Sequence, residues 1–277
     1  MIDELDFERR FGGVKRLYGE VGFSKLNAAH VVVIGIGGVG SWAAEALARN
    51  AIGAITLIDL DNIAESNVNR QLHAVDGAFG KAKVSAMRER ILSINPLCNV
   101  REIEDFITLQ NIAKVLNFKC DVILDCIDDA QVKIALADFC KRNKIQLIMA
   151  GSAGGRLDPT RIQVADLAHV TGDRLLSKVR NQLRRDYNFP KAVNLKKPAK
   201  FGINCVFSDE QAIKPDSNSV NPNAADSNTT EASCEINREI DSASITGLNC
   251  AGYGSSVCVT APFGFTAAQL AIKQLLL

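Results

Sequence analysis

A glycine-rich turn near the N-terminus constrains the fold of this 277-residue chain more than any other feature. The run GIGGVGS (35–41) follows a β-branched apolar stretch (30–35) and precedes a stretch of helical spacing (41–50). A strand, a glycine turn and a helix in this order are typical of a nucleotide-binding unit, because the helix N-terminus presents free N–H groups to a phosphate. The glycines expected to shape this turn or to admit a phosphate are Gly35, Gly37, Gly38 and Gly40.

Apolar runs alternate with stretches of helical spacing along most of the chain. The predicted strands are 30–35, 54–60, 100–103, 121–126, 145–151 and 161–167. The predicted helices are 41–50, 79–94, 108–116, 130–143 and 173–185. Strands that alternate with helices favour a parallel sheet with right-handed crossovers. We therefore expect an α/β fold: a Rossmann-like, doubly wound, mainly parallel sheet with helices on both faces and a C-terminal extension.

The composition of the chain changes along its length and suggests three parts. Residues 1–29 are expected to form an N-terminal helical arm, and residues 30–155 an ATP-binding Rossmann-like domain. Residues 156–277 are expected to form a C-terminal extension that packs on the same sheet. Within that extension, 209–244 is polar and has no apolar periodicity, which predicts a mobile loop.

The segment 242–272 contains no charged residue and no histidine, and it is long enough to cross a bilayer. It also carries Pro262, Gln269 and several glycines, so we expect a buried turn and a core helix at about Pro262–Leu276 instead of a membrane span. The N-terminus has acidic residues where a secretory signal would be basic and then apolar. Eight cysteines without a C-x-x-C pair indicate neither a disulfide scaffold nor a zinc knuckle. A cytoplasmic protein is expected.

Polar residues after the predicted strands indicate the chemistry of the nucleotide site. Asp59 ends the strand after the glycine turn, where a carboxylate can hold a ribose hydroxyl, as in a nicotinamide-dependent dehydrogenase. Asn67, Arg70 and Lys83 follow, and a hydride-transfer site has no use for so many phosphate ligands. Adenylation does, because cationic groups neutralise charge between the α-phosphate and the leaving pyrophosphate. Asp128, at the end of another strand, is a candidate ligand for Mg²⁺.

These motifs, in this order, resemble the ubiquitin-activating-enzyme superfamily, which includes the adenylyltransferases of molybdopterin and thiamine synthesis. The shared motifs are GxGGVGS, DxDN with Asp59 and Asp61, SNxNRQ, GxxK and DxxDD. The match is closer still to the tRNA threonylcarbamoyladenosine dehydratase branch, through FERRFGGVKRLYGE, GSAGGRLDPTRIQVADL and NCAGYGSS. The resemblance covers roughly 6–207 and 246–276.

The resemblance implies a role for each matching residue. ATP would lie over the glycine turn, with Asp59 and Asp61 beside it, while Asn67, Arg70 and Lys83 face its phosphates. Asp128 would assist the Mg²⁺ ion or the adenylation step, and a monovalent cation, Na⁺ or K⁺, is a further expected ligand. The implied reaction is ATP-dependent cyclisation of N6-threonylcarbamoyladenosine beside the tRNA anticodon, by adenylation of the threonyl carboxylate. The implied assembly is a homodimer.

A basic stretch, 174–200, holds nine Lys or Arg residues and one acid. It is either an ordinary solvated face or a surface for phosphate groups, and the resemblance favours contact with tRNA. The residues proposed for that contact are Arg174, Lys178, Arg180, Arg184 and Arg185.

Two alternatives stay open on the sequence. In the first, the protein adenylates the C-terminal carboxylate of a small sulfur-carrier protein; the lack of the zinc cysteines of those relatives argues against it. In the second, Cys250 serves a sulfur relay with a cysteine desulfurase or sulfur acceptor, or acts as a catalytic thiol, although a small buried residue is the favoured interpretation. The arginine that relatives supply from a partner subunit has no clear equivalent, and Arg10 and Arg16 are the candidates to replace it.

Overall fold

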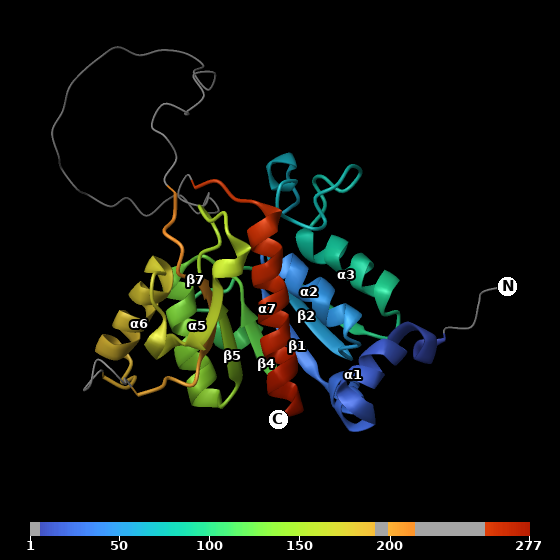
Figure 1. The fold of residues 1–277 in the computed structure, drawn as a ribbon, viewed down its shortest axis with the longest axis horizontal. Helices are drawn as coiled ribbons and strands as arrows, with labels where there is room; N and C mark the ends of the chain where they lie inside the picture. Colours follow the sequence, from blue (N-terminus) through green and yellow to red (C-terminus); the bar gives the residue numbers. More distant parts are fainter. Residues whose placement is uncertain (1–5, 192–198, 214–252) are drawn as a thin grey trace, which may run out of the picture.

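A seven-stranded sheet with the order β3-β2-β1-β4-β5-β7-β6 forms the centre of the molecule (Figure 1). The computed structural model describes residues 6–191, 199–213 and 253–277. The strands are β1 (His30–Ile34), β2 (Ala54–Ile58), β3 (Asn99–Ile103), β4 (Val122–Asp125), β5 (Gln146–Ala150), β6 (Ile162–Asp166) and β7 (Asn204–Ser208). All neighbours pair in parallel except β6, which runs antiparallel to β7 at one edge. The predicted Rossmann-like α/β fold is confirmed.

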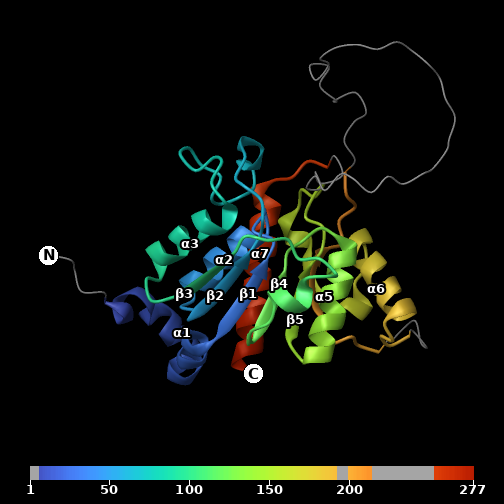
Figure 2. The same ribbon diagram turned by 180° about the vertical axis from the view of Figure 1, so that it is seen from behind.

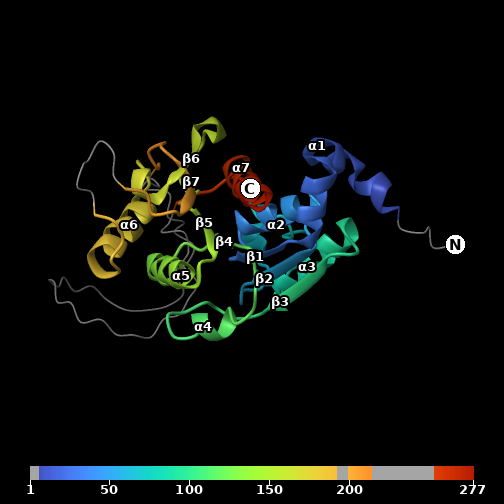
Figure 3. The same ribbon diagram turned by 90° about the horizontal axis from the view of Figure 1, so that it is seen from below.

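Helices cover both faces of the sheet, as Figures 2 and 3 show from behind and from below. One face carries α1 (Phe7–Ala28), α2 (Gly40–Arg49), α3 (Lys83–Ile94) and α7 (Val257–Leu276). The other carries α4 (Ile112–Val115), α5 (Ala130–Asn143) and α6 (Arg174–Asp186). Central strands are buried on both sides: Val31 and Val33 enter the first core, while Val32 and Ile34 enter the second. This is why these strands read as unbroken apolar runs.

The uncharged C-terminal stretch forms α7, which packs against α2 and the sheet. No helix in the described part of the chain is long and apolar enough to span a membrane. The prediction placed the start of this helix at Pro262, and that start is wrong by one turn or more. Ser256 caps the helix by accepting from the Cys258 N–H, so Pro262 lies inside the helix. Proline is well tolerated near a helix start, which made it a misleading marker.

The long connection between β2 and α3 was also misjudged at its end. A helix was predicted from residue 79, but α3 begins at Lys83. Gly80 adopts a φ of +82°, which no right-handed helix accommodates, and Ala82 forms a bridge with Asn62. The residues 59–82 therefore form a loop above the carboxyl ends of the strands, beside the start of α7 (Figure 1).

Candidate active site

The glycine turn between β1 and α2 is shaped by two close approaches of the backbone. Gly35 has a φ of +85°, and a side chain there would meet the Cys126 backbone at 3.1 Å. A Cβ on Gly40 would lie 1.8 Å from the Gly35 carbonyl oxygen, so only glycine fits. Gly37 differs, because the nearest atom to an added Cβ is the Gln71 Nε2 at 3.9 Å. The turn is thus closed beneath Gly40 and open above Gly37, as a phosphate-binding loop requires.

Asp59 follows β2 and joins the glycine turn to the next loop. One of its carboxylate oxygens accepts the Ile36 N–H at 2.6 Å, and the other accepts the Asp61 N–H at 2.9 Å. Burial raises the pKa of the Asp59 carboxyl group above its ordinary value, while the charge of Lys83 and these two N–H groups oppose the increase. Asp59 therefore fixes the turn geometry and stands at its edge.

Lys83 and Asp61 form an ion pair at the same end of the sheet. The Lys83 Nζ donates to the Asp61 carboxylate at 2.7 Å. The lysine side chain is nearly buried and the aspartate is 45% exposed, so the pair has one side open to solvent. The first residue of α3 thus brings its ammonium group to the strand ends, although 22 positions separate it from Asp61.

Asn67 and Arg70 lie on a tight turn that is anchored to two helices. The Asn67 side chain is buried, and its Oδ1 accepts the Ala64 N–H at 3.1 Å. The Arg70 guanidinium donates to the Ser66 carbonyl at 2.7 Å, and the Arg70 carbonyl accepts the indole N–H of Trp42. The turn is therefore held in place locally, with the Arg70 guanidinium at its surface.

Asp128 follows β4 and is exposed. The protein around it partly excludes water, which raises the pKa of its carboxyl group, and the charges of Asp129 and Asp61 add to the increase. Asp61 is thus close enough to act on Asp128, and the loops after β2 and β4 meet. In the described residues, no cluster of three or more His, Cys, Asp or Glu side chains suits a metal ion.

A fully buried ion pair behind Asp128 was missed by the sequence analysis. The Lys133 Nζ donates to the Asp125 Oδ1 at 3.0 Å, and both side chains have no exposed surface. The Ile127 N–H donates to the same carboxylate oxygen at 3.1 Å, so the pair fixes the turn that carries Asp128. The signal was present, because Lys133 falls on the apolar face of a predicted helix and Asp125 falls in an apolar strand.

Gln71 and His73, which extend the Asn67–Arg70 turn, are also buried. The Gln71 Oε1 and both ring nitrogens of His73 have no hydrogen-bond partner among the residues that the structure describes. Burial lowers the pKa of His73 to about 4, and the charge of Lys83 lowers it further. Cys250, the remaining predicted catalytic residue, lies outside the described residues.

The predicted basic surface divides into two sets on α6. Arg174, Lys178 and Arg185 are exposed along one side of the helix, together with Asn181; we call these four residues the exposed stripe. The other two arginines, Arg180 and Arg184, make internal contacts: the Val170 carbonyl accepts from the first, and the Pro190 carbonyl accepts from the second.

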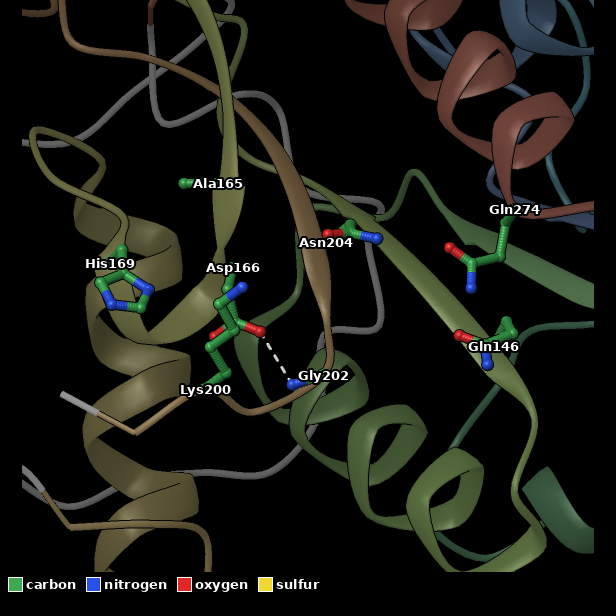
Figure 4. Close-up of a pocket in the computed structure, with 8 residues that line it drawn as sticks. All are labelled: Gln146, Ala165, Asp166, His169, Lys200, Gly202, Asn204 and Gln274. Carbon is green, nitrogen blue, oxygen red and sulfur yellow. Dashed lines mark hydrogen bonds between the residues drawn. The ribbon is translucent and has the colours of Figure 1, made fainter. Parts of the chain in front are cut away.

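A polar hollow lies at the opposite end of the sheet, as Figure 4 shows. It is lined by the first residues of β5 and β7, Gln146 and Asn204, and by Asp166, whose carboxylate accepts the Gly202 N–H. None of the predicted site residues lines it. The candidate site is therefore at the carboxyl ends of the strands, where open α/β sheets place their ligands.

Comparison with known proteins places the whole chain in one family. The model of the ThiF family matches residues 12–276. A protein of Haemophilus influenzae named tRNA threonylcarbamoyladenosine dehydratase is 46% identical, over 98% of this chain and 95% of its own length. An Escherichia coli protein of the same name is 44% identical, over 98% and 94%.

A solved structure gives the same result for the fold. The crystal structure of the E. coli tRNA N6-threonylcarbamoyladenosine dehydratase in complex with ATP has a TM-score of 0.80 and 41% sequence identity. The match covers 99% of this chain and 97% of that chain. The chain therefore belongs to the ThiF family, within its branch of tRNA threonylcarbamoyladenosine dehydratases.

Proposed function

We propose that this protein is an ATP-dependent tRNA threonylcarbamoyladenosine dehydratase. The carboxylate of the threonylcarbamoyl group attacks the α-phosphorus of ATP, which releases pyrophosphate and forms an acyl-adenylate. A nucleophile within the same modified base then attacks the acyl carbon and expels AMP, so that the nucleoside closes a ring and has lost one water. The observation that carries this proposal is the similarity to dehydratases over 98% of the chain, together with the glycine turn and its cationic groups.

The residues at the strand ends suit each part of this chemistry. The open side of Gly37 and the N-terminus of α2 would receive the phosphates, with Asp59 at the edge of the turn for the ribose. Arg70 and Lys83 would neutralise charge that develops as pyrophosphate leaves. Ring closure then needs little more than positioning, because both reacting groups belong to one nucleoside.

Mg²⁺ is the metal that this arrangement would hold. It is usually bound by one or two carboxylates together with substrate phosphates, so a cluster of three protein ligands is not required. Asp128 is exposed at the right edge and has a second carboxylate, Asp61, nearby, which fits that requirement. A bound Mg²⁺ would polarise the phosphate oxygens. A monovalent cation remains an expectation of the resemblance.

The exposed stripe is proposed to contact the phosphate backbone of tRNA. Its three cations project from one side of α6, and that helix begins at the same edge of the sheet as the nucleotide site, because its cap Asp173 accepts the Ser152 N–H just after β5. Arg180 and Arg184 are left out of this contact, because their guanidinium groups are engaged with backbone carbonyls.

A homodimer is proposed as the working form. Leu17 and Val21, on α1, are 72% and 74% exposed, which is unusual for apolar side chains unless a partner covers them. Arg10 donates to the Ile94 carbonyl at the end of α3, so within one chain it lies at the far end of the sheet from Gly37. An arginine of α1 would serve the site only across a dimer interface. A sulfur-acceptor partner depends on Cys250 and stays an expectation.

Mass spectrometry of nucleosides tests the proposed function. Threonylcarbamoyl-modified tRNA is incubated with the protein and ATP, and the proposal expects an ATP-dependent loss of one water from the modified nucleoside. Arg70→Ala should slow pyrophosphate release at least about tenfold. Arg88→Ala, which removes an arginine paired with Glu102 on the outside of α3, is the matched control and should be silent. Unchanged nucleoside, with pyrophosphate exchange on a small carrier protein instead, would favour the sulfur-carrier alternative.

A further inference from the structure

Arg156, in the loop after β5, is buried without a partner for its charge. The residue is 4% exposed. Its Nε and Nη1 have no hydrogen-bond acceptor, and no carboxylate pairs with it, within the part of the chain that the structure describes. A buried cation normally has a counter-charge, because removing it from water is unfavourable unless another group compensates. The structure therefore holds a cationic donor whose partner is missing.

Nearby carboxylates do not supply that partner, because they are engaged elsewhere. Glu210 accepts the backbone N–H groups of Leu157 and Asp158. Asp209 pairs with the side chain of Arg161 at 2.8 Å. The loop is thus built with its acids satisfied by other donors, while its one enclosed guanidinium is left over.

The position of the loop connects Arg156 to the nucleotide site. The Gly155 N–H donates to the Gly254 carbonyl at 2.7 Å, and the Asn69 side chain donates to the next carbonyl, that of Ser255, also at 2.7 Å. Consecutive carbonyls of one strand of chain therefore join Gly155 to the turn that carries Arg70. Arg156 is adjacent to this connection.

The same loop is joined on its other side to the basic helix. The Ser152 N–H donates at 2.8 Å to Asp173, the residue that caps α6. Arg174, the first member of the exposed stripe, follows immediately. Arg156 thus belongs to a loop that lies between the adenylation site and the surface proposed for tRNA.

We propose that Arg156 binds an oxyanion of the RNA substrate where the strand enters the adenylation site; this rests on the proposed function. A guanidinium group presents a planar set of donors that matches a carboxylate or a phosphodiester in two parallel hydrogen bonds. Two substrate groups have this chemistry: the carboxylate of the threonylcarbamoyl group and the phosphodiester beside the modified nucleoside. Either one would supply the counter-charge that Arg156 lacks.

Binding and stability, measured together on Arg156→Gln, test the proposal. The variant should bind threonylcarbamoyl-modified tRNA about tenfold more weakly, the scale of one charge-assisted contact, and should bind ATP as the wild type does. Its Tm should be unchanged or higher, because an unpaired buried charge has been removed. Arg156→Lys, which keeps the charge, should recover part of the tRNA affinity. Arg161→Gln is the matched control, because it removes an arginine from the same loop that already has a partner.

The outcomes separate the two sources and the two proposals. Weaker binding of modified tRNA alone identifies the carboxylate, and equal weakening for modified and unmodified tRNA identifies the phosphodiester. Wild-type affinity in Arg156→Gln, or a lower Tm with parallel losses for ATP and tRNA, overturns the assignment of Arg156. If the wild type binds tRNA but removes no water, the proposed function fails, while the affinity ratio still decides the role of Arg156.

Discussion

Protonation of His73 should make the protein lose stability in mild acid. The side chain is 5% exposed, and its two ring nitrogens are enclosed without partners among the described residues. Burial, aided by the nearby charge of Lys83, lowers the pKa of His73 from 6.5 to about 4. Between these two values the unfolded chain binds more protons at this position than the folded protein does. The free energy of unfolding must therefore fall as the pH falls from about 7 toward 4.

The size of the effect follows from the two pKa values. At pH 5 the histidine of the unfolded chain is almost fully protonated, while in the folded protein only about a tenth of it is. The difference corresponds to a loss of about 2 kcal/mol between pH 7 and pH 5. His73→Leu has no titrating group at this position, so its unfolding free energy should fall by about 2 kcal/mol less than that of the wild type.

Urea unfolding at pH 7 and pH 5, followed by circular dichroism, measures this difference. The exposed His169→Leu controls for the loss of one histidine from the surface. If the wild type and His73→Leu lose the same stability between the two pH values, His73 binds its proton equally well folded and unfolded. The argument from burial would then be refuted.

Three further predictions concern the site and its support. Gly40→Ala should destabilise the protein by about 1–3 kcal/mol and abolish ATP binding, because the new Cβ meets the Gly35 carbonyl, whereas Gly37→Ala should keep the Tm and weaken ATP binding alone; thermal unfolding with ATP titration separates them. Lys133→Met should cost about 3–5 kcal/mol by leaving Asp125 unpaired, and a double variant with Asp125→Asn should recover more than half, as a urea double-mutant cycle would measure. Neutralising the three cations of the exposed stripe should lower the salt dependence of tRNA binding by roughly one unit of slope for each tRNA phosphate that no longer has a cation beside it, and an unchanged slope would return α6 to an ordinary solvated face.

The order of elements and the glycine turn could be predicted because both depend on short-range pattern. Apolar runs such as 30–35 are buried on two faces, and Gly40 is required by a contact within its own turn. The division of the arginines on α6 could not be predicted, because Arg180 and Arg184 bond carbonyls brought to them by neighbouring segments. A count of basic residues treats all of them alike.

The candidate site was predictable in its members more than in its connections. Motif order indicated Asp61 and Lys83 as separate ligands, yet they form an ion pair with each other. The enclosed nitrogens of Arg156 depend on which acids of the loop are already engaged, which is a property of folded geometry. Pattern reasoning finds groups that can meet a ligand, but only coordinates reveal which groups have already met one another.

The packing of α7 on α2 has a consequence for biosynthesis. A Cβ on Gly264 would come within 2.4 Å of the Val39 carbonyl, so the last helix packs directly on the loop that receives the nucleotide. The same helix reaches α1, where Lys25 donates to the Leu276 carbonyl across 251 positions of sequence. A ribosome translates the glycine turn early, but that turn is backed only after α7 has left the exit tunnel. Chaperones that shield nascent chains would therefore meet an exposed face of α2 for most of the time that synthesis takes.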